Sequence, residues 1–329
     1  MNKKNKTFLI IGFSPQIIEI INFCNKYQIN LYIISGIRQK NSNQIEKDLY
    51  DKIKKIKFIN IEFISRLSNS KIYTDIINQK MDYIISLGSP FIFNKKIISL
   101  YKRKIINSHG APLPEYKGGG GLTWRYLNSD TRGVVLFHYI DEKIDNGEII
   151  YFHNFTFPKN KIIYEWIKIQ IKEERKGIKK ILKLIYEGKI LKSWKHPKLM
   201  SSYFPRINTK LHGYINFNWH GYHINRFING FSFPYGGSST FVNSHKVNIL
   251  KSSFISKKRK FNHPFVNGVI FEINDNFLFV FVDGGYLKLE ISYVLSKYRI
   301  KLGDRFHTPY SFLDRAFKTR IFYNAKGIN

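Results

Sequence analysis

Cysteine is nearly absent from this chain of 329 residues, which contains only Cys24. A single cysteine excludes a disulfide framework and a cysteine-rich zinc site, and it fits a reducing compartment. The basic N-terminus and the short apolar run after it imitate a signal peptide, but Pro15, Gln16 and Glu19 interrupt the run and no small-residue cleavage site follows. No other run approaches the length that spans a membrane. We therefore expect a cytoplasmic protein with no membrane segment.

Acidic residues are also scarce. The 23 Asp and Glu residues are outnumbered by 54 Lys and Arg residues, which gives a formal net charge of +31. This charge predicts attraction to polyanions such as tRNA, phosphorylated substrates or anionic lipid. The alternative is a compositional bias, because Lys, Ile and Asn are abundant everywhere. The charge is spread along the chain instead of forming one stripe, which favours the compositional explanation.

The glycine-rich fingerprint of dinucleotide-binding proteins is missing as well. Residues 7–12 and 30–35 have the apolar pattern of strands and enclose an amphipathic helix that ends near Lys26, so the chain opens with a β-α-β unit. Only Gly12 lies in the first turn, where a dinucleotide site needs three glycines. The pattern therefore predicts a Rossmann-like α/β domain with a mostly parallel sheet, without NAD binding.

The second half of the chain has a different pattern. A long amphipathic helix is expected over residues 164–186, and a polar connector with two prolines follows it. After Arg206 come short strand-like runs with turns at residues 274–276 and 283–285, which indicate a small OB-like all-β domain. We therefore predict a catalytic domain over residues 1–200, the β domain over 206–300, and a tail over 301–329, in which residues 313–329 are either an interface or a frayed end.

Most of the distinctive chemistry lies between Lys104 and Ile150. An apolar run ends in Asn107-Ser108-His109, and alternate residues of a strand share a face, so Asn107 and His109 should lie together. A second strand-like run, residues 134–140, leads into an acidic loop that contains Asp145. An amide, an imidazole and a carboxylate on two strand ends can move a proton and stabilise an oxyanion.

The ordered motifs N-x-H, P-L-P-x-Y-x-G and D-x-x-x-D-x-G resemble those of the formyltransferases that use 10-formyltetrahydrofolate. That family includes the glycinamide ribonucleotide, methionyl-tRNA and nucleotide-sugar enzymes. The resemblance implies that Asn107, His109 and Asp145 are catalytic: Asn107 holds the oxyanion, His109 moves the proton, and Asp145 supports the imidazole or a water. The later motifs N-R-F-I-N-G-F-S-F-P-Y-G-G-S-S-T and K-L-G-D-R-F-H-T-P resemble the family's C-terminal domain.

The resemblance also implies N10-formyltetrahydrofolate as the co-substrate and no metal. In the family, the loop that corresponds to residues 88–93 wraps the pterin ring, mainly through backbone groups. An alternative for its aromatic side chains is that they only fill the core at a strand end. The expected cofactor-binding residues are Phe91, Ile92, Phe93, Ile140, Asp141 and Glu142.

The acceptor is predicted from weaker features. P-L-P-E-Y-K-G, H-Y-I-D and F-P-Y-G-G look most like the nucleotide-sugar enzymes, whose typical acceptor is a dTDP-4-amino-4,6-dideoxyhexose for lipopolysaccharide or O-antigen synthesis. A nucleotide sugar needs a cation for its diphosphate and a flat face for its base. The expected substrate residues are Gly118, Trp124, Arg226, Phe233 and Tyr235, although the aromatic ones could equally form the seam between the domains.

Two other functions stay open. One is a methionyl-tRNA formyltransferase, but the family's basic P-x-G-R-G-K insertion is absent after the second strand. The other is a non-catalytic, basic RNA-binding module on the same scaffold, which the complete set of Asn107, His109 and Asp145 disfavours. A homodimer is a further hypothesis that the sequence does not test.

Overall fold

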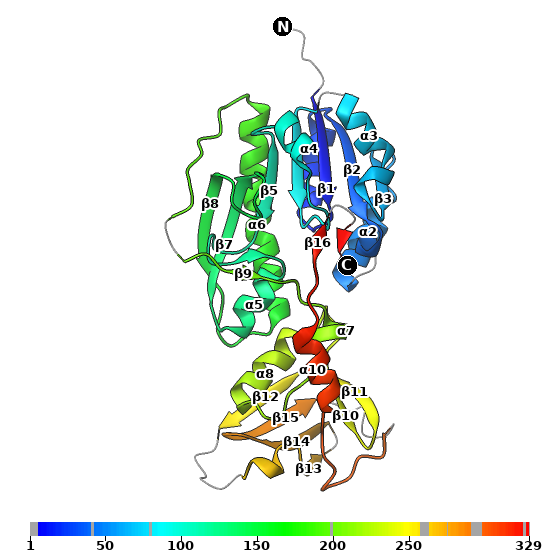
Figure 1. Ribbon diagram of the computed structural model, residues 1–329, viewed down its shortest axis with the longest axis vertical. Helices are drawn as coiled ribbons and strands as arrows, with labels where there is room; N and C mark the ends of the chain where they lie inside the picture. The colour runs from blue at the N-terminus through cyan, green and yellow to red at the C-terminus, as the bar shows by residue number, and fades with distance from the viewer. Residues whose placement is uncertain are drawn as a thin grey trace.

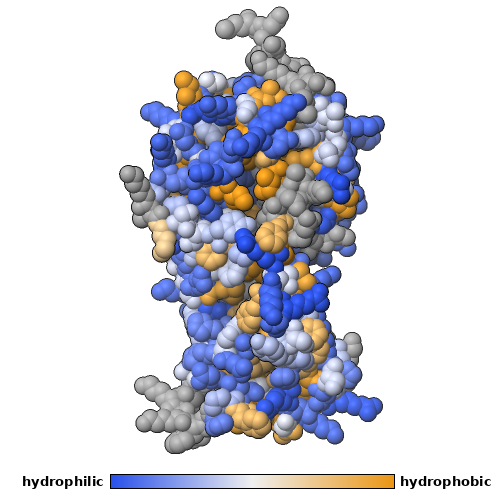
Figure 2. Space-filling view, viewed as in Figure 1, coloured by the Kyte–Doolittle hydropathy of each residue, from blue (hydrophilic) through white to orange (hydrophobic). Residues whose placement is uncertain are grey.

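A computed structural model describes residues 6–40, 43–78, 81–197, 200–256, 263–274, 276–290, 298–324 and 327–328. Two domains follow one another along the long axis of the molecule, with the larger N-terminal domain at the top of Figure 1. Hydrophilic residues cover most of the face shown in Figure 2, and hydrophobic residues appear there as separate patches.

The N-terminal domain is built on one seven-stranded sheet with the order β3-β2-β1-β4-β5-β7-β8. The first five strands in this order are parallel, whereas β7 runs antiparallel to both of its neighbours. The mostly parallel, Rossmann-like sheet is therefore confirmed, although β8 was not predicted. Its strands are β1 (Thr7–Gly12), β2 (Asn30–Gly36), β3 (Asn60–Ile64), β4 (Tyr83–Leu87), β5 (Ile105–His109), β7 (Arg132–Tyr139) and β8 (Ile149–Thr156).

Helices cover both faces of this sheet, as the alternating residues of β1 show. Phe8 and Ile10 belong to one core with residues of α1 and α6, and Leu9 and Ile11 belong to a second core with residues of α3 and α4. A strand buried on both faces needs apolar residues at every position, as residues 8–11 have. The helices of this domain are α1 (Ile17–Lys26), α2 (Gln44–Ile53), α3 (Lys71–Asn78), α4 (Lys95–Leu100), α5 (Gly121–Leu127) and α6 (Ile163–Tyr186), with 3-10 turns η1 (Ile37–Lys40) and η2 (Leu67–Asn69).

The C-terminal domain is a small β domain, as predicted. Among the described residues its ladders form a four-stranded sheet, β12-β15-β14-β13, and a separate β10-β11 hairpin, which share one core with helix α8. Strands β10 and β12 were not predicted, and the expected turn at residues 274–276 includes Asp275, which lies outside the described residues. The elements are α8 (Gly221–Gly230), β10 (Ser238–Val242), β11 (His245–Ile249), β12 (Ser252–Ser256), η3 (Pro264–Val266), β13 (Ile270–Asn274), β14 (Phe277–Val282) and β15 (Gly285–Glu290).

Short elements connect the two domains. Strand β6 (Lys117–Gly118) pairs in parallel with β9 (Tyr203–Phe204), which lies in the predicted connector. The tail contains helix α10 (Tyr310–Lys318), packed beside α7 (Thr209–His212), and the strands β16 (Tyr323–Asn324) and β17 (Gly327–Ile328). Figure 1 shows the chain returning from α10 towards the N-terminal domain. None of the helices in the described part of the chain is long and apolar enough to cross a membrane.

Trp166 of α6 anchors that helix to the segment that follows β8. Its side chain is fully buried, stacks on Phe157 at 4.4 Å between ring centroids, and donates from Nε1 to the Pro158 carbonyl at 2.9 Å. Trp166→Ala is expected to lower the free energy of unfolding by about 3–5 kcal/mol, because it leaves a large cavity and an unsatisfied carbonyl. Urea denaturation followed by circular dichroism measures this loss. Trp194→Ala, at a side chain that is 45% exposed, is the control and should cost far less.

Candidate active site

Asn107 and His138 face each other on the antiparallel strands β5 and β7. Asn107 Nδ2 lies 3.1 Å from His138 Nε2, and His138 Nδ1 lies 2.8 Å from the Tyr139 carbonyl oxygen. Because a carbonyl oxygen only accepts, Nδ1 carries the hydrogen and Nε2 accepts from Asn107. One N–H of Asn107 is therefore bound to His138, and the second is left to donate into the cavity that Asn107 lines.

His109 presents one basic nitrogen to its surroundings. Its Nε2 lies 2.8 Å from the Tyr116 carbonyl, so Nε2–H donates and Nδ1 carries the lone pair. Nδ1 lies 3.8 Å from Asp145 Oδ2. Burial lowers the pKa of His109, and the Asp145 carboxylate opposes part of this shift. A buried imidazole that is neutral near pH 7 is suited to act as a general base.

Asp145 is a nearly buried carboxylate with partners from three segments. Its Oδ2 accepts from the Gly118 N–H at 2.8 Å, and its Oδ1 lies 3.6 Å from His138 Nε2. Burial by itself raises the pKa of this carboxyl, but His109, His138 and the Gly118 N–H together hold the pKa below its usual range. Asp145 also has a φ of 46°, in the left-handed region, where backbone strain is characteristic of functional sites.

Two glycines give the loops around Asp145 their shape. A Cβ on Gly147 would lie 1.7 Å from the Tyr139 carbonyl oxygen, so only glycine lets the acidic loop return against β7. Gly118 has a φ of 94°, and a Cβ there would lie 2.3 Å from the Phe204 carbonyl oxygen of β9. These close approaches explain why the loop motifs place glycine at both positions.

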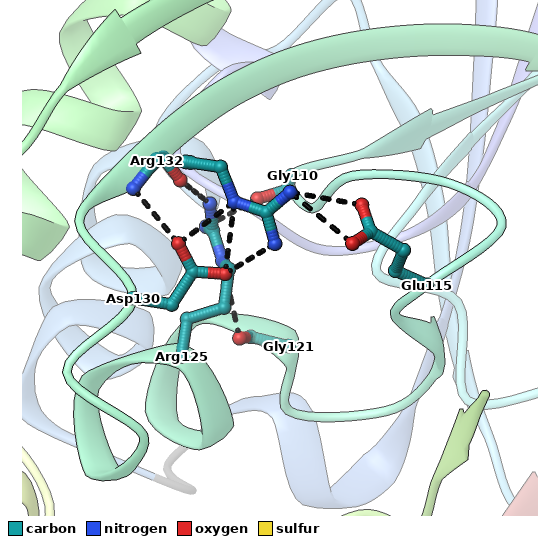
Figure 3. Close-up of polar contacts among 6 residues, drawn as sticks. All are labelled: Gly110, Glu115, Gly121, Arg125, Asp130 and Arg132. Carbon is teal, nitrogen blue, oxygen red and sulfur yellow. Dashed lines mark hydrogen bonds and ion pairs between the residues drawn. The ribbon is translucent and has the colours of Figure 1, made fainter. Parts of the chain in front are cut away.

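A buried arginine holds the segment that follows His109. Figure 3 shows the Arg125 guanidinium donating to the backbone carbonyls of Gly110, Gly121 and Arg132, with 2.6 Å to the Gly110 oxygen. Arg132 extends this network to Asp130 and Glu115 on the surface. Burial lowers the pKa of Arg125 to about 10, which leaves it charged at neutral pH. The cation therefore ties the residue after His109 to α5 and β7.

A cavity of about 490 Å³ joins these groups at the carboxyl end of the parallel strands. Asn107, His109, His138 and Asp145 all line it. Phe91 and Phe93 are buried and Ile92 is half-exposed. The predicted cofactor residues, which all line this cavity, are Phe91, Ile92, Phe93, Ile140, Asp141 and Glu142.

The predicted substrate residues divide into two groups. Gly118 and Tyr235 line the cavity, whereas Trp124, Arg226 and Phe233 do not. Arg226 is buried and donates to the Tyr126 carbonyl, with 2.7 Å from Nε, so its charge serves to join α8 to α5. Phe233 packs edge-on against Tyr164, and Trp124 Nε1 donates to the Pro205 carbonyl at 2.7 Å. Arg226 and Phe233 thus lie at the seam between the domains.

Several residues of the cavity were not predicted. Glu174 on α6 and Glu46 on α2 line it, and burial raises the pKa of each to about 7. Arg206 lines it as well, and its positive charge offsets part of the rise in the pKa of Glu46. Nothing in the sequence distinguishes these side chains from ordinary surface charges of helices and loops. In the described part of the chain, no group of three or more His, Cys, Asp or Glu side chains is arranged to hold a metal ion.

Two family models match the chain. The Formyl transferase model matches residues 4–160, and the model described as Formyl transferase, C-terminal domain, matches residues 208–301. The two matches correspond to the two domains of the structure. The chain belongs to the formyl transferase family. The predicted family is therefore confirmed.

Other formyl transferases share part of the sequence. The chain is 25% identical over 267 residues to the bifunctional polymyxin resistance protein ArnA of Wigglesworthia glossinidia brevipalpis, a match that covers 76% of this chain and 38% of that protein. It is 24% identical over 197 residues to the methionyl-tRNA formyltransferase of Clostridioides difficile (strain 630), which covers 60% of each. The chain thus spans less than two thirds of the length of both relatives.

Solved structures of the family share the fold. The N-formyltransferase from Helicobacter canadensis, in complex with folinic acid and dTDP-3-aminofucose, has a TM-score of 0.66 at 20% identity, covering 87% of this chain and 99% of that one. WlaRD, a sugar 3N-formyl transferase studied with dTDP and 5-N-formyl-THF, has a TM-score of 0.61 at 23% identity, covering 87% and 98%.

Gly118 provides a direct test of the site. Gly118→Ala is expected to displace the Asp145 carboxylate, because the added Cβ collides with Phe204, and to lower kcat for formyl transfer roughly 100-fold. Gly188→Ala is the matched control: it also has a positive φ, but its Cβ would meet no atom within 4 Å. Steady-state kinetics of the two folded variants measure the difference, and equal rates would contradict the role given to the Gly118 N–H.

Proposed function

We propose that this protein transfers the formyl group of N10-formyltetrahydrofolate to the amino group of a nucleotide-linked amino sugar. The observation that carries the proposal is the convergence of Asn107, His109 and Asp145 on one cavity. Residues predicted to bind the folate line the same cavity. For the acceptor, we propose a dTDP-4-amino-4,6-dideoxyhexose in surface-glycan synthesis, in accord with the nucleotide-sugar motifs of the sequence.

The two ends of the cavity suit two substrates. Phe91 and Phe93 belong to the core on the α3 and α4 face of the sheet, whereas Glu174 comes from α6 on the other face. We assign the aromatic end with the loop at residues 140–142 to the folate. Glu46, Glu174 and Arg206, which also line the cavity, are assigned to the acceptor, because charged side chains can bind hydroxyl and phosphate groups.

The catalytic side chains act at the point between these ends. The folate supplies the formyl group. His109 Nδ1 takes a proton from the acceptor amine as the new C–N bond forms, and the Asp145 carboxylate at 3.8 Å stabilises the resulting imidazolium. The free N–H of Asn107 donates to the carbonyl oxygen as it becomes negative. His109 then returns the proton to the leaving nitrogen as the old C–N bond breaks, so the formamide product forms and the enzyme is restored.

A methionyl-tRNA formyltransferase is the second candidate. The similarity to the enzyme of Clostridioides difficile and the net charge of +31 both favour it. The two candidates use the same chemistry at Asn107, His109 and Asp145 and differ in the acceptor.

Substrate choice is tested by supplying 10-formyltetrahydrofolate with dTDP-, UDP- and GDP-linked amino sugars, and separately with charged initiator tRNA, and measuring release of tetrahydrofolate. We expect turnover with a nucleotide sugar. His109→Ala and Asp145→Asn should each lower kcat by about 10²–10⁴-fold, because proton transfer is lost. His153→Ala, at an exposed histidine of β8, should retain the wild-type rate. Turnover with tRNA and with none of the sugars would refute the proposed acceptor.

The pH profile follows from the lowered pKa of His109. A general base must be neutral, so kcat/KM should fall as pH decreases through the pKa of His109, which lies below its ordinary value of 6.5, and should show no loss from this group above neutral pH. Asp145→Asn removes the charge that raises the pKa of His109, so the acidic limb should move to lower pH in that variant.

The two buried carboxyls of the cavity serve as controls for this profile. If kcat/KM also changes near pH 7 and this change disappears in Glu46→Gln or Glu174→Gln, it reports the titration of that carboxyl, whose pKa is about 7. A limb above pH 6.5 that persists in both variants would contradict the assignment of His109 as the base.

A further inference from the structure

A second cavity, of about 500 Å³, lies where α5, α7, α8 and α10 meet beside the connector. Its wall is mainly aromatic, with the histidines His212, His220 and His223 among its lining residues. Trp219 is half-buried and packs edge-on against Phe227, whereas Phe317 of α10 is 68% exposed. The cavity therefore presents flat apolar surfaces on one side and is open at Phe317.

This cavity adjoins the catalytic one. Arg206 and Ile207 line both, so the connector at residues 205–207 forms the boundary between them. Arg206 brings a positive charge to this boundary, next to Glu46 of the catalytic cavity. Trp124, which the sequence predicted to bind substrate, lines the second cavity and is held there by its hydrogen bond to the Pro205 carbonyl.

We propose that the acceptor nucleotide crosses this boundary, with its diphosphate against Arg206 and its base in the second cavity among Trp124, Trp219 and Phe317. The inference rests on the proposed function, because it places the amino sugar next to His109 in the catalytic cavity. A guanidinium binds phosphate oxygens through charge-assisted hydrogen bonds, and aromatic side chains stack on any of the nucleobases.

The order of the groups supports this occupant over others. A ligand that fits has a polar amine end, an anionic middle and a flat end, in the order in which His109, Arg206 and the aromatic wall occur. A nucleoside diphosphate sugar has this order of groups. The 3′-terminal nucleoside of a charged tRNA has a similar base but lacks a diphosphate next to the amine, so the two sources are separable by experiment.

The first experiment measures binding of dTDP, UDP, GDP and inorganic pyrophosphate to the full chain by isothermal titration calorimetry. We expect a nucleoside diphosphate to bind, to bind more tightly than pyrophosphate, and to compete with the acceptor. Arg206→Gln and Phe317→Ala should each weaken this binding about tenfold, the loss typical of one charge-assisted contact or one stacked ring. Phe317 is exposed, so its removal is compatible with folding even where Trp219→Ala is not.

The second experiment measures kinetics of the same variants. KM for the nucleotide sugar should rise about tenfold while kcat stays within about twofold, because the contacts are remote from the reacting amine. Arg315→Ala on the same helix as Phe317, and Phe265→Ala at a 72% exposed ring, are the matched controls and should leave KM unchanged. Trp219→Phe should retain more affinity than Trp219→Ala, because it keeps an aromatic face.

Some results would overturn the inference. Nucleotide binding that is insensitive to Arg206→Gln and Phe317→Ala would place the base elsewhere, even with formyl transfer to the sugar intact. Dimerisation that Phe317→Ala abolishes, without an effect on nucleotide binding, would assign the aromatic wall to a second copy of the chain. Formylation of tRNA alone would refute the proposed function, and sensitivity of free dTDP binding to Arg206→Gln would still support the nucleotide site.

Discussion

The buried carboxylate of Asp145 is the constraint on which the rest of the site depends. An ionised carboxylate is costly to bury unless it has hydrogen-bond and charge partners. Here the Gly118 N–H of β6 donates to the carboxylate, and the imidazoles of His109 on β5 and His138 on β7 lie 3.8 Å and 3.6 Å from its oxygens. Three segments must therefore be in place before Asp145 can be charged inside the protein. This requirement explains the sharp turn at Gly147 and the left-handed backbone at Asp145 itself.

The sheet also determines which helices contribute to the cavity. Its two faces carry different helices, and the cavity at its carboxyl edge is lined by Phe91 and Phe93 of the core on the α3 and α4 face and by Glu174 of α6. This position, at the ends of parallel strands, is the usual ligand site of open α/β sheets. The C-terminal domain adds Tyr235 to one wall of this cavity, and the connector adds Arg206. Asn107, His109, His138 and Asp145 thus come from the first domain, whereas the wall of the cavity also depends on the connector and the second domain.

The parts that could be predicted from the sequence are those set by short-range spacing. Asn107 and His109 are two residues apart on one strand, and a doubly covered sheet leaves continuous apolar runs such as residues 8–11. His138 was not predicted as part of the site. A single histidine inside a strand has the same sequence pattern whether its side chain binds the amide of Asn107 or only a backbone carbonyl. Strand β8 was missed because only its first two residues, Ile149 and Ile150, are buried, and the rest lacks a clear apolar alternation.

Arg226 illustrates the other limit. Its position beside aromatic residues resembles a phosphate site. In the structure, however, its guanidinium donates to the backbone carbonyl of Tyr126, a residue 100 positions earlier in the sequence. Arg206, in a polar connector, lies on the cavity wall instead. Which of the two arginines lines the cavity is decided by tertiary packing, and the local sequence does not indicate it.

The pairing of β6 with β9 has a mechanical consequence. Tyr203 and Phe204 lie in the connector that leads to the C-terminal domain, and they hold Lys117 and Gly118, whose N–H binds Asp145. The connector is therefore linked to Asp145 through the two residue pairs of β6 and β9, and a rotation of the β domain would be transmitted to the Asp145 carboxylate through them. Chain cuts or domain exchanges made before residue 203 would keep β9 attached to the β domain. Those made after residue 204 would separate β9 from the β domain.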